Sequence, residues 1–291
     1  MKKAPISVYP LALALFALAP PSASEAASFV KSVEYVELPM AAGATTVSGN
    51  LTKGQVLANC VPFASMMTSG TDDEYDQVFA DVFFQAAPSR VTAQRFTSGG
   101  TLSVGVYVVE FDPAYVAVQQ NTFSLFAGVA STTTPIAAVN LSKAALVSYY
   151  RHGAVTNSWN DYAVAGWLSL TNQITWQRNT SAGTLNGHYY VFEARNNEFS
   201  VQAVSFAVGA GQPSATAPIA AVDMDKSFVL ASYQTAYASD DNEDGQIGVF
   251  LADPRRSRRS VLSRTPGPTP FPTSARSLCS SRRTCGCSAA R

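Results

Sequence analysis

The chain has 291 residues, of which 47% are hydrophobic and 14% charged, and its formal net charge at pH 7 is zero. Residues 27–253 contain 9 Lys and Arg against 19 Asp and Glu, whereas residues 254–291 contain nine Arg and no acid. The acidic body argues against nucleic acid as its partner, because nucleic-acid binding relies on Lys and Arg to neutralise phosphates.

Residues 1–26 have the pattern of a signal peptide. Two lysines near the start precede an apolar run from Leu11 to Ala19, and small residues follow up to Ala26 and Ala27. The run is too short to span a bilayer, and an uncleaved anchor is the alternative. We expect cleavage after Ala26 or Ala27, no transmembrane segment in the mature chain, and a secreted, periplasmic or cell-surface location.

Two stretches of the body have nearly the same sequence. Residues 95–110 (RFTSGGTLSVGVYVVE) and 178–193 (RNTSAGTLNGHYYVFE) share nine of sixteen positions without a gap, at a spacing of 83 residues. The motif PIAAV at 135–139 recurs at 218–222, again 83 residues later. Self-similarity at a fixed period indicates tandem structural repeats.

We place repeat 1 at residues 27–130, repeat 2 at 131–212 and an incomplete repeat 3 at 213–253. Short segments rich in Val, Ile, Tyr, Phe and Thr alternate with clusters of Gly, Ser, Asn and Pro, and no long stretch of the body has a helical period. The fold class that we expect is all-β. Each repeat of about 83 residues should form a small antiparallel β-sandwich of jelly-roll or immunoglobulin-like kind.

A lysine helps to align the repeats. Lys143 recurs as Lys226, and Lys53 is taken as the counterpart in repeat 1. The interval from this lysine to the shared arginine is 42 residues in repeat 1 and 35 in repeat 2. We therefore expect about seven extra residues in repeat 1, in the polar loop from Thr68 to Asp76.

An arginine and a glutamate recur and could form a paired site. Arg95 and Glu110 return as Arg178 and Glu193. If a hairpin turn centres near Gly99, Glu110 lies seven residues beyond the residue opposite Arg95, a distance of about 23 Å along the strand. We expect both glutamates to bind lysines or backbone groups in a structural role, with ligand contact as the alternative.

Trp159 stands among polar residues in an expected loop, flanked by Asn157, Asn160 and Asp161. An aromatic ring can stack on a sugar ring while nearby amide and carboxylate groups bind its hydroxyls. These four residues are therefore the candidate glycan-binding set. The other two tryptophans lie in alternating strands, where core packing is the expected role.

Residues 240–245 read DDNEDG, which contains the first half of a calcium-binding loop. Asp240, Asn242 and Asp244 are the candidate calcium ligands. An EF-hand is excluded because the twelfth position, which needs a bidentate Glu, is Leu251. A solvated acidic turn is the alternative, and no other cofactor is expected.

The inventory of residues argues against an enzyme. His152 and His188 are the only histidines, and neither recurs in the other repeat. The motifs G-x-S-x-G and H-E-x-x-H are absent, and so is a phosphate-binding loop. We expect no catalytic residues.

The repeat pattern stops at Pro254. The spacing predicts an Arg at 261 and a Glu at 276, where the chain has Val261 and Arg276. Residues 254–291 form a basic tail, for which we keep two interpretations: a change of reading frame, or a disordered basic arm that binds anionic surfaces. In both cases repeat 3 lacks its second half, so unpaired strand edges and self-association are expected.

The repeats share a Lys-x-x-Val/Leu strand start, a Gln-Arg pair before a Gly turn and a Tyr-Val-x-Glu ending. Together these resemble repeat β-modules of uncharacterised exported bacterial proteins and of phage virion proteins, over roughly residues 51–252. The resemblance implies a surface or extracellular module and supplies no catalytic residues. A more distant likeness to H-type lectin domains transfers no sugar-binding position.

The sequence therefore leads to two functional expectations. The first is an exported, non-enzymatic protein whose β-repeats bind a glycan or another surface ligand. The second is a structural repeat protein of an envelope or virion-like layer that has no small ligand.

Overall fold

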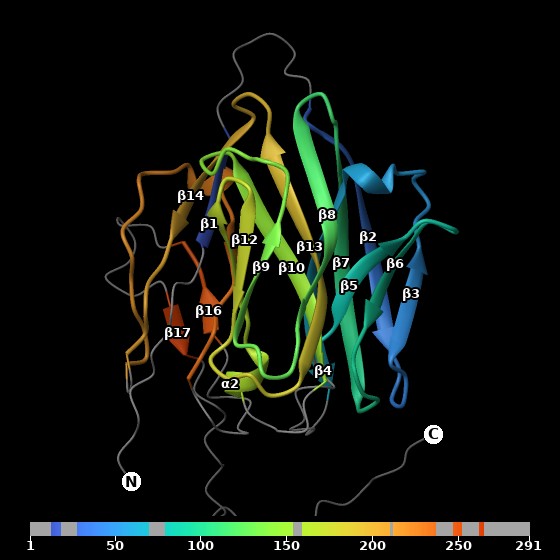
Figure 1. Cartoon of the computed structure of the whole chain (residues 1–291). Helices are drawn as coiled ribbons and strands as arrows, with labels where there is room; N and C mark the ends of the chain where they lie inside the picture. The colour runs from blue at the N-terminus through green and yellow to red at the C-terminus, as the bar shows by residue number, and fades with distance from the viewer. Residues whose placement is uncertain are drawn as a thin grey trace, which may run out of the picture.

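The computed structural model describes residues 13–18, 28–69, 79–153, 159–209, 212–236, 247–251 and 262–264. These residues form antiparallel sheets, together with one short α-helix, α2 (Trp159–Tyr162), and two 3-10 helices, Leu57–Asn59 and Met224–Lys226 (Figure 1). The prediction of an all-β, sandwich-type fold is confirmed.

Two sets of six strands have the same arrangement. We call the first set unit one: β2 (Val30–Met40), β3 (Thr46–Asn50), β4 (Cys60–Ser69), β5 (Asp81–Gln85), β6 (Arg90–Gln94) and β7 (Thr101–Phe111). Unit two contains β8 (Val116–Leu125), β9 (Ser131–Pro135), β10 (Ala144–Gly153), β11 (Ala165–Leu170), β12 (Gln173–Gln177) and β13 (Thr184–Ala194).

In each unit the first, sixth and third strands form one sheet, and the second, fifth and fourth form the other. The orders are β2-β7-β4 with β3-β6-β5, and β8-β13-β10 with β9-β12-β11. The chain thus alternates between the two sheets and returns its last strand to the middle of the first sheet. Of the two sandwich types that the sequence allowed, this winding order is the one of a jelly roll.

The strand pairing groups β8 with unit two, although the sequence analysis assigned residues up to 130 to repeat 1. A periodic sequence defines the length of a repeat but not the point at which its fold begins. That point is set by which strands pair.

The expectation of seven extra residues in repeat 1 is wrong. β10 begins 84 residues after β4, and β11 begins 84 residues after β5, so the connection between these strands has the same length in both units. Lys143 directly precedes β10, whereas Lys53 lies seven residues before β4. The two lysines therefore occupy different positions in their units.

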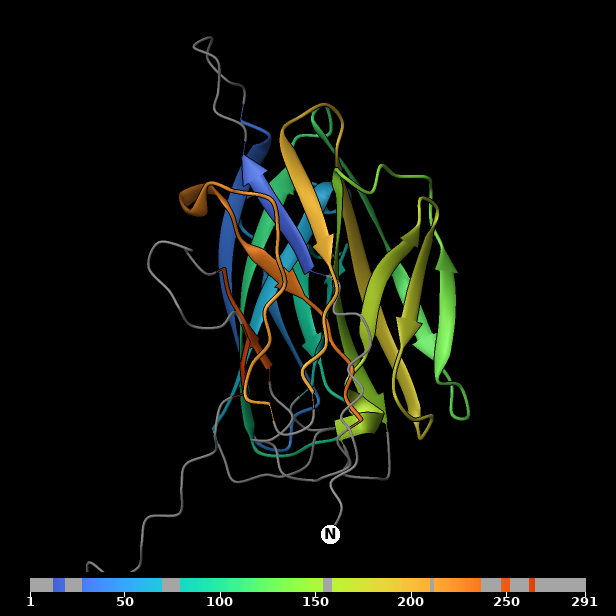
Figure 2. The same ribbon diagram turned by 90° about the vertical axis from the view of Figure 1, so that its left-hand side faces the viewer.

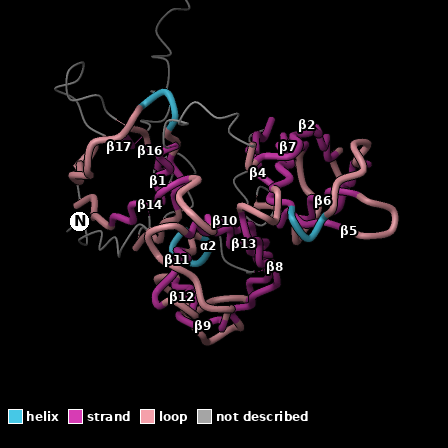
Figure 3. The backbone as a smooth tube through the Cα atoms, turned by 90° about the horizontal axis from the view of Figure 1, so that it is seen from above, coloured by secondary structure: helices cyan, strands magenta, loops and turns pink. Residues whose placement is uncertain are grey.

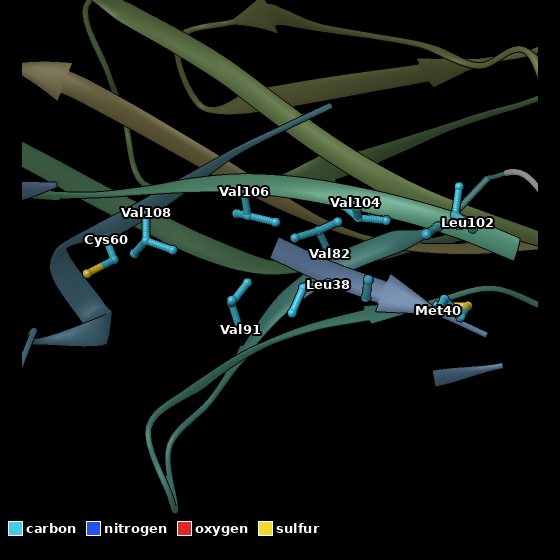
Figure 4. Close-up of a cluster of buried hydrophobic side chains, with 11 residues drawn as sticks. Leu38, Met40, Cys60, Val82, Val91, Leu102, Val104, Val106 and Val108 are labelled. Carbon is cyan, nitrogen blue, oxygen red and sulfur yellow. The ribbon is translucent and has the colours of Figure 1, made fainter. Parts of the chain in front are cut away.

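Each unit buries one face of its strands in its own core. Along β7, the residues that alternate inward are at most 1% exposed: Leu102, Val104, Val106 and Val108. They pack against β2, β4, β5 and β6, as Figure 4 shows for Leu38, Val82 and Val91. Burial of these branched side chains, at roughly 25 cal/mol per Å² of apolar surface, stabilises the sandwich.

The core of unit two is centred on a tryptophan. Trp176 is fully buried and stacks on Phe123, with ring centroids 3.7 Å apart. Its strand partner is Gly166, where an added Cβ would lie 2.3 Å from the indole ring. At the equivalent pair of unit one, Ala93 faces Val82. The pair of Trp176 and Gly166 in unit two thus takes the place of the pair of Ala93 and Val82 in unit one.

The units also share a core between them. Side chains from the outer face of the β8-β13-β10 sheet, such as Tyr190 and Phe192, are buried against Val61 and Phe111 of unit one and Phe199 of β14 (Phe199–Val204). Seen from above, the three groups of strands lie around a common centre (Figure 3). The outer face of one sheet in unit two is therefore covered by its neighbours.

The last group of strands, which we call unit three, is built from distant parts of the chain. It contains a sheet with the order β14-β1-β15, formed by β14, β1 (Leu13–Leu18) and β15 (Val229–Ala231) (Figure 2). β16 (Ile247–Val249) and β17 (Leu262–Arg264) pair with each other nearby. Part of the segment assigned to the signal peptide thus lies in this sheet.

Candidate functional site

Two buried arginines join the turns of their units. Arg95 is 1% exposed and donates hydrogen bonds of 2.7–3.3 Å to four backbone carbonyl oxygens: those of Ala41, Ala44, Gly99 and Gly100. Arg178 is also 1% exposed and binds the carbonyl oxygens at the equivalent positions of unit two: Phe126, Val129, Ala182 and Gly183. A guanidinium carries five N–H donors, which suits it to several converging carbonyls. The recurring arginine is therefore a structural clamp.

The recurring glutamates bind backbone groups, which is one of the two kinds of partner that we expected. Lys53 and Lys143, the expected lysine partners, instead donate hydrogen bonds to the carbonyl oxygens of Val33 and Asn196. Glu110 accepts a hydrogen bond of 3.2 Å from the backbone N–H of Val56, and Glu193 accepts one of 2.7 Å from that of Asn140. The two N–H groups lie 84 residues apart, at the same place in the connection between the second and third strands. These glutamates hold that connection against the last strand of their units.

Unit two adds a histidine to its arginine clamp. His152 is fully buried, and its Nε2 lies 3.0 Å from an Nη of Arg178. Its ring is also 4.4 Å from that of buried Tyr162. Burial, and then the charge of Arg178, lower the pKa of His152 to about 4, so the imidazole is neutral at physiological pH.

The four candidate glycan-binding residues have different structural surroundings. Asn157 lies outside the described residues, and Trp159 is the first residue of α2. Asn160 is half-buried, and its carbonyl oxygen accepts a hydrogen bond of 3.3 Å from the N–H of Thr180. Asp161 is 5% exposed, and its charge opposes the lowering of the Arg178 pKa by burial. The carboxylate of Asp161 thus acts inside unit two.

The candidate calcium ligands Asp240, Asn242 and Asp244 lie outside the described residues. Within the described ranges, no group of three or more His, Cys, Asp or Glu side chains is arranged to hold a metal ion.

A buried carboxylate links units one and two. Asp81 of β5 is 3% exposed and lies 2.7 Å from Nδ1 of His188 on β13. The backbone N–H of His188 donates a second bond of 3.0 Å to Asp81. Burial raises the pKa of the Asp81 carboxyl, and the bonds from His188 oppose this effect.

Two tyrosines add hydrogen bonds across the same boundary. Tyr149 Oη accepts a bond of 2.6 Å from the N–H of Ala64 and donates one of 3.2 Å to the carbonyl oxygen of Pro62. Tyr190 Oη donates to the carbonyl oxygen of Val82 at 3.2 Å. These polar contacts fix the orientation of unit two against unit one.

A cavity of about 580 Å³ lies between unit two and the β14–β15 part of unit three. Its lining is mostly apolar and includes Val147, Tyr149, Trp167, Val201, Leu230 and Tyr233. The size is that of a small-molecule pocket, but few polar groups converge there to orient a ligand. The cavity is better explained as a loosely filled region between units.

Unit one exposes an apolar patch on the outer face of its β2-β7-β4 sheet. We call this the outer-face patch; its members are Val33, Tyr35, Met67 and Tyr107, which are 42–72% exposed. Tyr35 and Tyr107 are strand partners with ring centroids 4.9 Å apart, and Tyr35 covers Gly105, where an added Cβ would lie 2.9 Å from its hydroxyl. The patch combines two aromatic rings with two aliphatic side chains.

The equivalent face of unit two is covered. Tyr190, which lies 83 residues after Tyr107 and at the same position of the last strand, is only 1% exposed. Its ring meets that of Phe84 edge-on at 5.7 Å. In the described part of the chain, no module covers Tyr107 in this way.

The outer-face patch was not among the sites expected from the sequence, although the sequence contains a sign of it. Val104, Val106 and Val108 alternate inward along β7, so Tyr107 falls on the face that a half-buried strand normally leaves polar. Tyr35 falls on the outward face of β2 by the same rule. Two aromatic residues on the outward faces of paired strands were the readable sign.

A comparison with models of protein families finds no match for this chain, and neither do comparisons with curated proteins and with solved structures. The resemblances to exported and virion modules and to H-type lectins therefore stay predictions. Among the described residues, no helix has the length and apolar character needed to cross a membrane.

Proposed function

We propose that this chain is an exported, non-enzymatic β-module protein that works by assembly, and that the outer-face patch of unit one is its contact surface. The observation that carries the proposal is the contrast between equivalent tyrosines. Tyr190 is buried under a neighbouring module, whereas Tyr107 is 55% exposed. Val33, Tyr35 and Tyr107 lie at neighbouring positions of paired strands, and a group of exposed apolar side chains can mark a surface that binds other proteins.

The contact between units one and two supports this proposal. Unit one covers the outer face of unit two with β5, which supplies Asp81 and Phe84. A similar strand of a second molecule could cover the equivalent face of unit one. Aromatic residues and Met are enriched at the centres of protein interfaces, and the patch contains both kinds.

The test is sedimentation velocity of the full chain across a range of protein concentrations. We expect reversible self-association that becomes about tenfold weaker or more when Tyr35 and Tyr107 are both replaced by Ser. The matched control is Leu170→Ser, because Leu170 is 56% exposed but lies in unit two, away from the patch. A chain that stays monomeric at every concentration would refute the assembly function.

A glycan-binding function is the second candidate, and the tyrosine pair favours it as well. Exposed rings can stack on sugar faces, and Glu37 and Ser103, joined by a hydrogen bond of 3.3 Å, provide polar groups beside the pair. In this case a glycan array should give signals that the Tyr35→Ser, Tyr107→Ser variant loses, while the protein sediments as a monomer. The glycan array and the sedimentation velocity experiment together distinguish the two functions.

A further inference from the structure

We propose that unit three contains a strand-acceptor site between β14 and β15, and that its occupant is the apolar segment Leu13–Leu18 of the same chain. The site would recognise an extended strand of consecutive apolar residues through backbone hydrogen bonds on both sides. It is separate from the outer-face patch, so the two proposals stand or fall independently.

β1 has the register of a strand that is missing from unit three. In unit two, Val191 of the middle strand pairs with Gln119 on one side and Leu146 on the other. In unit three, Leu15 pairs with Gln202 and with Val229, which lie 83 residues after those two partners. The pairings with β14 and with β15 therefore both put Leu15 at the position that Val191 occupies in unit two.

The two edges of the site have the same local structure as the equivalent strands of unit two. Gln119 donates a side-chain hydrogen bond to the carbonyl oxygen of Ala137 and accepts one from its N–H, at 3.1 and 2.8 Å. Gln202 makes the same pair of bonds with Ala220, at 3.3 and 2.7 Å. β14 and the segment before β15 are therefore held as in unit two.

The stretch of sequence at the equivalent position of the third repeat is unsuited to a middle strand. A last strand 83 residues after β13 would span residues 267–277, which read GPTPFPTSARS. Three prolines in this stretch have no N–H to donate, and a middle strand needs donors toward both neighbours. The basic tail is thus unsuited to the site.

The chemistry of the occupant follows from the equivalent positions of unit two. Consecutive residues there, Val191 and Phe192, are each 1% exposed, because β13 packs against the core of unit two on one face and against the neighbouring units on the other. A strand in this place must therefore be apolar at successive positions rather than at alternate ones. Leu13–Leu18, with the sequence LALFAL, meets this requirement.

One consequence concerns the apolar core of the predicted signal peptide. The hydrophobic run that marks a signal peptide is also the run that a doubly covered strand needs. While Leu13–Leu18 stays attached, it completes the sheet of unit three. A chain that lacks them would expose the facing edges of β14 and β15.

The main test is cross-linking in register, in a full chain that is produced without export and has its four native cysteines replaced by alanine. Paired positions of neighbouring antiparallel strands have Cα atoms about 4.5–5.5 Å apart, within the range of a disulfide. Leu15→Cys with Gln202→Cys should form a disulfide under mild oxidation. Leu15→Cys with Ala203→Cys should not, because successive side chains of a strand point to opposite faces.

Hydrogen exchange gives a second measurement that needs no cross-link. Leu15→Pro removes a ladder donor from β1, so the amides of β14 and β15 should exchange about tenfold faster or more, while those of β8 and β10 keep their rates. Ser22→Pro, outside β1, is the matched control and should change nothing in β14 or β15. Equal cross-linking of both cysteine pairs, or unchanged exchange in Leu15→Pro, would overturn the proposal.

Discussion

Units one and two have the same strand order and the same arginine clamp, but they differ in one of their core pairs and in the exposure of their outer faces. Arg95 and Arg178 bind equivalent carbonyl oxygens. Only the second has a buried histidine beside it among the contacts described, and only Tyr107 of the two equivalent tyrosines is exposed. Positions that hold the backbone thus recur, whereas core pairs and outer faces are free to change.

The largest effect should come from the shared clamp. Replacement of Arg95 or Arg178 by Met leaves four carbonyl oxygens without their buried donor, so each variant should lose about 4 kcal/mol or more of unfolding free energy. Arg→Lys variants should be intermediate, since an ammonium cannot reach carbonyls in a planar fork. Urea unfolding measures both. If the Met variant at one of the two positions lost less than about 1 kcal/mol of unfolding free energy, the two arginines would not be equivalent clamps.

The core pairs of the two units offer the next test. Gly166→Val should cost about 3 kcal/mol, because its Cβ would overlap the ring of Trp176. Trp176→Ala should cost about 4 kcal/mol through the cavity it leaves. The double variant recreates the Val82 and Ala93 pair of unit one, so it should be clearly more stable than additive costs imply. A double-mutant cycle in urea measures this coupling, and strict additivity would contradict it.

Unit two should also lose stability in acid through its buried histidine, a residue that unit one lacks. The folded pKa of His152, about 4, lies below its ordinary value of 6.5, so the unfolded state takes up a proton first as the pH falls. The stability contributed by the neutral ring is complete above pH 6.5 and is lost between pH 6.5 and 4, by up to about 3 kcal/mol.

The measurement is unfolding free energy against pH, compared with His152→Gln. The variant should remove this part of the slope while leaving the contribution of Asp81, which has the opposite sign because its folded pKa is raised. Identical slopes for both proteins would show that His152 does not cause the acid sensitivity.

The smallest effect should distinguish the two equivalent tyrosines. Tyr190→Phe removes the hydrogen bond to the carbonyl oxygen of Val82 and should cost about 1 kcal/mol. Tyr107→Phe changes an exposed ring and should stay within about 0.5 kcal/mol. Thermal unfolding of the two variants side by side is sufficient. Equal losses would mean that the outer face of unit one is covered in solution.

The sequence was a good guide wherever one residue acts on its own unit. Segments rich in Val, Ile, Tyr and Phe were expected to be strands, and the recurring glutamates were expected to bind lysines or backbone groups in a structural role. These properties depend on strand geometry and hydrogen-bond inventory, which are local. The spacing of 83 residues predicted tandem repeats, and two sets of six strands have the same order in the two sheets of their units.

The sequence failed where the outcome depends on a partner far along the chain. A polar loop with a tryptophan suggested a surface site, but Asp161 turns inward toward Arg178, which only the fold brings near. The alignment on lysines predicted seven extra residues in a loop of repeat 1, and the structure does not have them. The prediction failed because Lys53 and Lys143 lie at different points of their units. Pairing of Leu13–Leu18 with β14 and β15 spans most of the chain, and no local pattern encodes it.

The winding order has a consequence for biosynthesis. In units one and two, the strand that closes the first sheet is the last of the six to leave the ribosome, yet it must slide between two strands made much earlier. Until then, the nascent polypeptide carries a split sheet whose open edges invite aggregation. A ribosome that stalls or terminates shortly before such a strand would leave a sandwich without its last strand. Because insertion of this strand forms contacts between residues far apart in the sequence, it should be the slow step of folding.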